Sequence, residues 1–137
     1  MDITKLDTKA AANDGAKMEV LDLAGAPVLK SDGVTPVTIT LMGKDSDAWI
    51  KFDNQVTNRR LAQGTRMKLT AEALKADQIK ELAICTVGWD GIGLGDDETP
   101  FSYEKAVELY TLSPDIREQA KAFIEDRSNF SKASPTS

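Results

Sequence analysis

One stretch of the chain decides the expected fold: Thr86–Phe130, with the sequence TVGWDGIGLGDDETPFSYEKAVELYTLSPDIREQAKAFIEDRSNF. It begins at the end of a predicted helix and continues through a loop rich in glycine and acidic residues. Two amphipathic helices follow, each preceded by a serine that can cap it, Ser102 and Ser113. Pro114 stands at the first helical position, where proline is favoured. The pattern indicates a packing unit that positions a loop, and we find no catalytic motif in it.

Two further helices are predicted upstream of this stretch. The first spans about residues 47–63, because Trp49, Phe52 and Val56 recur at helical spacing on one face. The second spans about residues 71–86, with an apolar stripe that includes Ile79, Leu82 and Ala83. Together with the two helices after the glycine-rich loop, they make about four C-terminal helices.

Strands are expected nearer the N-terminus. Residues 37–42, VTITLM, alternate β-branched residues with threonine and form the clearest strand pattern of the chain. A shorter apolar run near residue 20 precedes it, and the turn sequence SDG at residues 31–33 lies between them. We therefore expect two or three antiparallel strands over residues 17–42. The predicted fold is a single α+β domain, in which this small β element packs against the helices.

The 137 residues are enough for one domain that buries about two thirds of its unfolded surface. Residues 1–16 are polar and alanine-rich without a clear period, which is typical of a flexible N-terminal arm. The domain is expected over residues 17–130. The small polar residues 131–137 predict a disordered C-terminal tail.

The composition excludes several classes of function. The chain has no histidine, so Ser-His-Asp, Cys-His and histidine-zinc sites cannot form within it. Its single cysteine excludes an internal disulfide and fits a reducing compartment. The net charge of −5 argues against a dedicated nucleic-acid surface. We see neither a signal peptide nor an apolar run of membrane-spanning length, and expect no membrane partner.

The glycine-rich loop offers two kinds of ligand site, and neither is favoured. Gly91–Gly95, GIGLG, is not followed by the GK[ST] of a phosphate-binding loop, and the acidic residues after it would repel phosphate. Asp96, Asp97 and neighbouring carboxylates could hold a hard cation, but their spacing lacks the alternation of an EF-hand loop. A solvated acidic loop is the favoured interpretation. Such a loop can still contact a basic partner, so Asp96 and Asp97 are candidate partner-binding residues.

Three other features have a structural and a functional interpretation. Cys85 has no histidine to activate its thiol, so a buried structural cysteine is favoured. The basic cluster of Arg59, Arg60, Arg66 and Lys68 is either the solvated end of a helix or a docking surface for an acidic or helical partner. Trp89 either fills a gap in the core, which is favoured, or stands exposed as a contact residue. We therefore expect neither catalytic residues nor a cofactor or metal site.

The chain resembles tail assembly chaperones of long-tailed bacteriophages. The similarity covers about residues 17–130 and is carried by CTVGWDGI at 85–92, PFS at 100–102, AxxLY at 106–110, PxIREQ at 114–119, DRxNF at 126–130, TNRR at 57–60, and VTITL followed by GKDS within 37–46.

The resemblance implies a non-enzymatic protein of the host cytoplasm that is absent from the mature virion. Such chaperones hold the long helical tape measure protein soluble until tail tube subunits polymerise around it. In many of these phages a ribosomal frameshift adds an extension that binds the tail tube protein. A chaperone of this kind needs an apolar groove between helices, and many copies could coat one partner. Self-association stays open, and the alternative is a structural virion protein, such as a minor tail or head–tail connector subunit.

Overall fold

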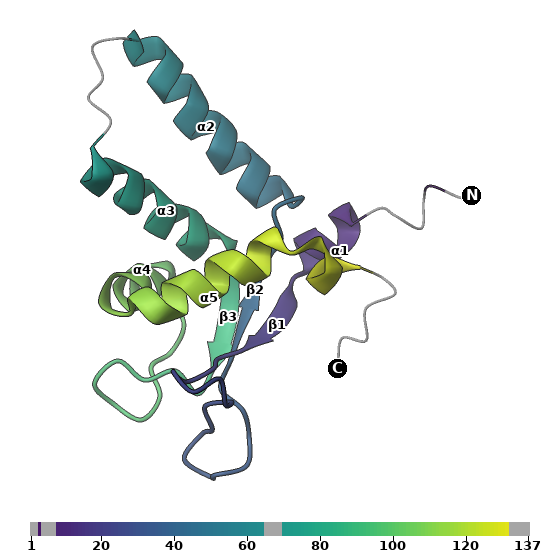
Figure 1. The fold of residues 1–137 in the computed structure, drawn as a ribbon, viewed down its shortest axis with the longest axis vertical. Helices are drawn as coiled ribbons and strands as arrows, with labels where there is room; N and C mark the ends of the chain where they lie inside the picture. The colour runs from purple at the N-terminus through teal and green to yellow at the C-terminus, as the bar shows by residue number, and fades with distance from the viewer. Residues whose placement is uncertain (1–2, 4–7, 65–69, 132–137) are drawn as a thin grey trace.

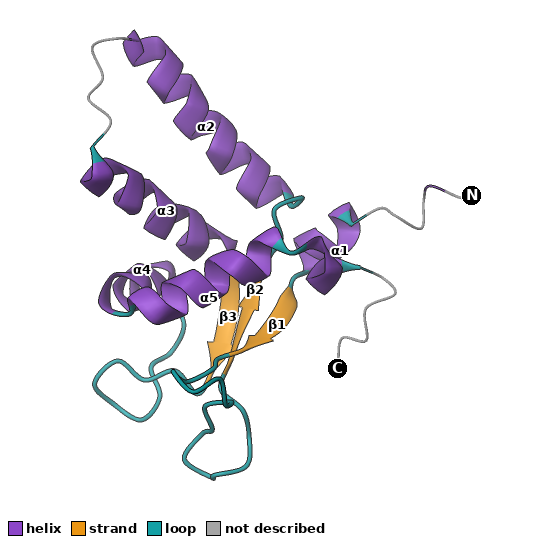
Figure 2. Cartoon of the chain, in the orientation of Figure 1, coloured by secondary structure: helices purple, strands orange, loops and turns teal. Residues whose placement is uncertain are grey.

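The computed structural model describes residues 3, 8–64 and 70–131. Its elements are, in chain order, α1 (Lys9–Asp14), β1 (Ala16–Glu19), β2 (Thr38–Leu41), α2 (Asp47–Gln63), α3 (Ala71–Cys85), β3 (Thr86–Asp90), α4 (Tyr103–Leu112), α5 (Pro114–Glu125) and the short 3₁₀ helix η3 (Arg127–Phe130) (Figures 1 and 2). A small antiparallel sheet beside helices α2–α5 confirms the predicted α+β fold. The tail residues 132–137 lie outside the described part of the chain.

The sheet has the strand order β1-β2-β3, and both pairs are antiparallel. Met18 pairs with Ile39, and Ile39 pairs with Trp89 on its other side. Of the strands expected over residues 17–42, β1 and β2 form. Between them, Leu29 makes an isolated bridge to Pro36, and the Val28 backbone is hydrogen-bonded to Val20 and Val37 without forming a further strand.

Strand β3 corrects the prediction that helix and loop continue through Thr86 and Gly88. Thr86 ends α3 with an extended backbone, φ −83° and ψ 124°, and the chain passes directly into the strand. The β-branched and aromatic residues of TVGWD suit a strand once β2 lies beside them. The glycine-rich loop therefore begins at Gly91, whose positive φ of 87° ends the strand.

The segment expected to be a flexible arm, residues 1–16, is folded in its second half. Residues 9–14 form α1, Ala12 is buried, and Ala16 already belongs to β1. Ala12 and Ala16 pack with Phe130 of η3 in a small cluster apart from the main core. The N-terminal and C-terminal ends of the domain are thus joined by apolar contact, which local periodicity could not predict.

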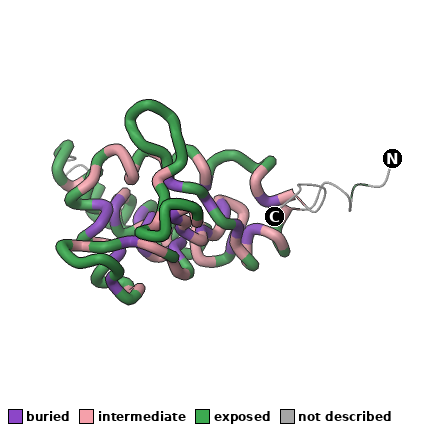
Figure 3. The backbone as a smooth tube through the Cα atoms, turned by 90° about the horizontal axis from the view of Figure 1, so that it is seen from below, coloured by how far each residue is buried: buried purple, intermediate pink, exposed green. Residues whose placement is uncertain are grey.

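The main core lies between the sheet and helices α3, α4 and α5. Ile39, Leu41, Leu82, Tyr110 and Ile124 are its largest fully buried apolar side chains. In Figure 3 the buried positions lie toward the middle of the molecule, and the outer loops are exposed. Helix α2 stands away from the sheet and runs antiparallel to α3 (Figure 1). Among the described residues, no helix is both long and apolar enough to cross a membrane.

Candidate partner-binding site

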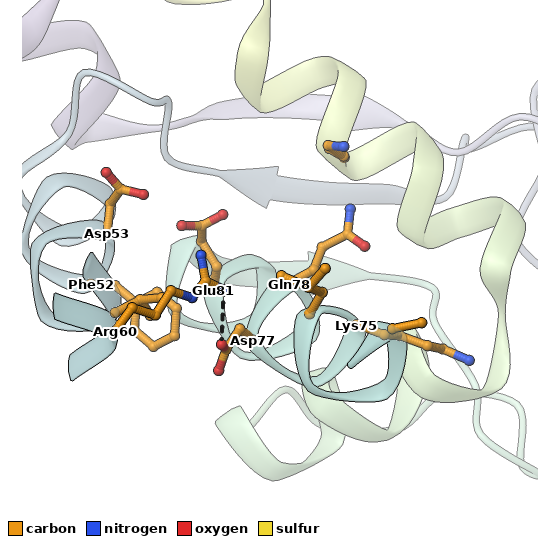
Figure 4. A pocket seen from close by; sticks show the side chains of 11 residues that line it. Phe52, Asp53, Arg60, Lys75, Asp77, Gln78 and Glu81 are labelled. Carbon is orange, nitrogen blue, oxygen red and sulfur yellow. Dashed lines mark hydrogen bonds and ion pairs between the residues drawn. The ribbon is translucent and has the colours of Figure 1, made fainter. Parts of the chain in front are cut away.

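A groove of about 490 Å³ lies between α2 and α3, with α5 at its edge. Its lining residues come mainly from the facing sides of the two helices: Phe52, Asp53, Val56, Arg60, Ala71, Leu74, Lys75, Asp77, Gln78, Glu81 and, from α5, Lys121. Figure 4 shows these side chains in place. Four of the eleven lining residues are apolar, and the six charged ones are three cations and three carboxylates.

The groove exists because α2 packs mainly on α3 and leaves part of its apolar face uncovered. In the 17 residues of α2, Val56 is the one buried side chain, although Trp49 and Phe52 share its face. Helix α3 directs its larger apolar residues, Ile79 and Leu82, into the main core. Toward α2 it presents Leu74, which is 42% exposed.

The predicted basic residues Arg59 and Arg60 join the two helices. Their guanidinium groups donate to the same carboxylate oxygen, Oδ2 of Asp77, at 2.7 and 3.3 Å. The Asp77 side chain is only 12% exposed, so the shared carboxylate of these two ion pairs is largely shielded from solvent. Within the described residues, the Arg60 Nε is buried without a hydrogen-bond partner. The remaining predicted basic residues, Arg66 and Lys68, lie outside the described part of the chain.

Several carboxylates lie near Glu81, at the end of the groove that is formed by the C-terminal half of α3. The pKa of Glu81 is raised to about 7, first because the side chain is partly buried and then because Asp53, Glu125 and Asp77 repel its charge. Lys121 acts in the opposite direction. The Asp53 and Glu81 carboxylates both point toward the side where α5 lies (Figure 4). This end of the groove therefore disfavours further negative charge.

The Glu81 carboxylate should make stability depend on pH. Its ordinary pKa of 4.5 rises to about 7 in the folded protein, so the folded state holds the proton more tightly. The contribution of Glu81 to stability is then fully present below pH 4.5 and is lost as the pH rises through 7. Because Glu81 is partly exposed, we expect Glu81→Gln to stabilise the protein at pH 8 by only about 1 kcal/mol. At pH 4 the variant should match the wild type.

Urea unfolding at pH 4 and pH 8 measures this difference. Glu19→Gln is the matched control, because Glu19 is exposed on β1 and does not line the groove. A gain for Glu81→Gln that is equal at both pH values would contradict the assignment.

The other predicted contact residues lie at the opposite end of the molecule, around the loop between β3 and α4 (Figure 1). Trp89 belongs to β3, packs edge-on against Phe101 with ring centroids 5.1 Å apart, and donates from Nε1 to the Thr99 carbonyl. Trp89 is partly buried against the core, as the favoured interpretation predicted. That Trp89 contacts a partner stays a prediction.

The acidic residues of this loop differ in their contacts. The Asp96 carboxylate accepts hydrogen bonds from the Leu94 N–H and the Thr99 hydroxyl, and the latter bond lowers the pKa of Asp96. Asp97 is exposed. The Lys30 ammonium, from the segment between β1 and β2, lies 3.3 Å from a Glu98 carboxylate oxygen. Asp96 therefore shapes the loop, and the structure does not bring Asp96, Asp97 and Trp89 together with Arg59 and Arg60.

The cysteine does not form a nucleophilic site. Cys85 is fully buried, and burial raises the pKa of its thiol to about 12. The thiol therefore stays protonated at neutral pH, and thiolate is the reactive form. In the part of the chain that the structure describes, no three His, Cys, Asp or Glu side chains are grouped so that they could hold a metal ion.

Sequence patterns alone did not identify the groove. Its α3 wall, Leu74, Gln78 and Glu81, follows helical spacing beside the core stripe, but two of these residues are polar. An available clue was the apolar face of α2, Trp49, Phe52 and Val56, which has charged residues such as Asp53 and Arg60 beside it.

No protein-family model, curated protein or solved structure matches this chain. We therefore base the functional assignment on the residues of the chain itself. Two features bear on it: the resemblance in the short motifs and the groove between α2 and α3.

Proposed function

We propose that this protein is a tail assembly chaperone of a long-tailed bacteriophage, which binds the tape measure protein and keeps it soluble. The observation that carries the proposal is the open groove between α2 and α3, with apolar side chains on both walls. Amphipathic helices bind other proteins by placing their apolar face in such a groove. A long helical partner offers many such faces in succession.

The positions of the shared motifs are compatible with this assignment. Cys85, Ala106, Tyr110 and Phe130 are all buried, so the motifs that contain them determine packing. The TNRR motif at residues 57–60 lies on α2 and includes Arg60, which lines the groove. The resemblance thus extends from the core to the candidate binding surface.

Weak individual contacts are sufficient for this function. One groove of 490 Å³ accepts a few side chains of a partner helix. Binding of many copies along one long chain makes the total interaction strong although each contact is weak. The chaperone would act in the host cytoplasm and leave before the virion is complete. In the same proposal, a longer frameshifted product contacts the tail tube protein.

Co-expression with the tape measure protein of the same phage tests the proposal. We expect the soluble fraction of the tape measure protein to rise several-fold when this chain is present, and the two proteins to co-purify. The matched control is an unrelated acidic protein expressed at the same level. Equal solubility with and without this chain would refute the assignment.

Mass spectrometry of purified virions separates the chaperone from the alternative structural protein. A chaperone should be absent from mature particles or present in trace amounts only. A constant number of copies in each particle would identify the chain as a minor tail or connector subunit and reject the chaperone assignment.

A further inference from the structure

We propose that the outer edge of strand β1 pairs with β1 of a second copy of this chain, so that the two sheets join into one. The inference does not depend on the proposed function, because it rests on the geometry and charge of the strand. Three observations carry it. The backbone of this edge has no partner, the next position along it is closed by a side chain, and its exposed charges match those of a second copy.

Strand β1 lies at one edge of the sheet (Figure 1), where alternate residues direct their backbone groups toward β2 and away from it. At Val20, directly after the strand, the N–H donates to the Val37 carbonyl at 3.0 Å. Lys17 and Glu19 alternate with Val20, so their N–H and carbonyl groups face outward. Among the described residues, no group bonds to them on that side. This edge is therefore open to another strand.

The next outward-facing position, Leu21, is closed by a side chain from α5. The Gln119 amide accepts the Leu21 N–H at 2.9 Å and donates to the Leu21 carbonyl at 2.8 Å. These are the two bonds that a residue of a neighbouring antiparallel strand would make. The contact independently shows that the odd-numbered residues bond outward. It also limits the open edge to Lys17 and Glu19.

The side chains of these two residues carry opposite charges on the exposed face of the sheet. Lys17 and Glu19 are exposed, whereas Ala16 and Met18 are buried. Among the described residues, neither charge takes part in an ion pair. If two β1 strands pair antiparallel about Met18, each Lys17 lies directly opposite Glu19 of the other copy. Opposite charges at such positions stabilise an antiparallel pair.

The charges also select the register of the pair. A shift by one residue would set outward-facing backbone groups against inward-facing ones, and their hydrogen bonds would be lost. A shift by two residues would place Lys17 opposite Lys17, or Glu19 opposite Glu19. The register centred on Met18 therefore gives both the backbone hydrogen bonds and the opposite charges. Such a pair has two-fold symmetry, which is the commonest symmetry of protein dimers.

Charged residues on a short edge strand can instead prevent pairing. They do so against strands whose charges do not match, and a second copy of this chain carries the matching charges. We therefore commit to a second copy as the occupant. Because β1 has only four residues, we expect the pair to be weak. At the low protein concentration of an unfolding measurement the chain is then a monomer, and Glu19 remains a suitable control there.

Sedimentation equilibrium of the full chain tests the pairing at protein concentrations from about 10 μM to about 1 mM, because a weak dimer forms only at the upper end. We expect the wild type to pass from monomer to dimer in this range. Lys17→Glu and Glu19→Lys each place like charges opposite one another twice in the symmetric dimer, so each should raise the Kd about tenfold or more. The control Lys51→Glu makes the same charge change on exposed α2 and should leave the Kd within about twofold.

Mixing the two variants separates direct pairing from a general effect of charge. Lys17→Glu carries two glutamates at these positions and Glu19→Lys carries two lysines, so a heterodimer regains opposite charges at both. The mixture should therefore form dimers about as well as the wild type, although each variant alone is largely monomeric. Circular dichroism checks that both variants fold.

Four outcomes would overturn the inference. The first is a wild type that stays monomeric up to about 1 mM, and the second is a dimer that both variants leave unchanged. The third is a mixture that does not associate when each variant alone has lost the dimer. The fourth is a Lys17→Glu variant that still dimerises but no longer co-purifies with the tape measure protein, which would identify a strand of that partner as the occupant.

Discussion

Phe130→Ala is expected to lower the free energy of unfolding by about 3–5 kcal/mol. Phe130 is only 2% exposed although it lies in the last described turn of the chain. Its ring packs edge-on against Phe123 with centroids 5.6 Å apart. It also packs with Ala12 and Ala16 in one apolar cluster. Removing the ring therefore leaves a cavity and also releases α1.

Gly43 shows how tightly this ring is enclosed. A Cβ atom at Gly43 would lie 2.8 Å from Cδ2 of Phe130, closer than atoms normally approach. Gly43→Ala should therefore destabilise the protein by about 1–3 kcal/mol, because the ring must move away. In the double variant with Phe130→Ala, the alanine at position 43 meets no ring and should have little further effect.

Urea unfolding at pH 7 checks both substitutions and their coupling. Leu112→Ala is the matched control, because Leu112 is 66% exposed at the end of α4 and should change stability by less than about 0.5 kcal/mol. A Phe130→Ala variant as stable as the wild type would show that the contact between η3 and α1 does not contribute to folding. If the losses of unfolding free energy for Gly43→Ala and Phe130→Ala are additive in the double variant, direct contact between residue 43 and the Phe130 ring is contradicted.

The helix boundaries could be predicted because their determinants are local. Ser102 and Ser113 accept hydrogen bonds from the backbone N–H groups of Lys105 and Ile116, as their positions in the sequence indicated. Gly64 ends α2 with a φ of 53°, which favours glycine. Each capping residue interacts with backbone groups only a few positions away, so the local sequence is enough to predict where the helix begins or ends.

Strand β3 and helix α1 could not be predicted in the same way. TVGWD becomes a strand because β2, more than forty residues earlier, supplies the hydrogen-bonding partner. Helix α1 is short and has no side-chain cap, and its one buried residue, Ala12, packs against Phe130 at the other end of the domain. Long-range contacts determine both elements, and such contacts leave no period in the local sequence.

The candidate site was predicted only in part, for a similar reason. Arg59 and Arg60 stood out as a basic cluster, but their partner Asp77 is identified only once α2 and α3 lie side by side. Glu81 is an ordinary helix residue in the sequence. Its raised pKa depends first on its burial and then on Asp53 from α2 and Glu125 from α5, and the fold produces all of these.

Tyr110→Ala is expected to lower the free energy of unfolding by about 3–5 kcal/mol, as for other large aromatic residues of a core. Tyr110 is the largest fully buried side chain and contributes to the core from α4. Burial raises the pKa of Tyr110 to about 12, so its hydroxyl stays protonated at neutral pH. Tyr103→Ala is the control on the same helix, because Tyr103 is exposed and should contribute less than about 1 kcal/mol.

The hydroxyl of Tyr110 should account for a smaller, separable part of this effect. The Thr86 hydroxyl donates to the Leu82 carbonyl at 2.8 Å, so its proton is used, and the Tyr110 hydroxyl must donate to Thr86 Oγ1 at 2.7 Å. Tyr110→Phe should therefore destabilise the protein by about 1 kcal/mol. Thr86→Val removes the acceptor and leaves the Tyr110 hydroxyl buried without a partner, so it should destabilise by about 1–3 kcal/mol. When Tyr110→Phe is added to Thr86→Val, it should no longer destabilise, because no buried donor remains unpaired. Independent effects of the two substitutions in urea unfolding would rule out this hydrogen bond as the link between the end of α3 and α4.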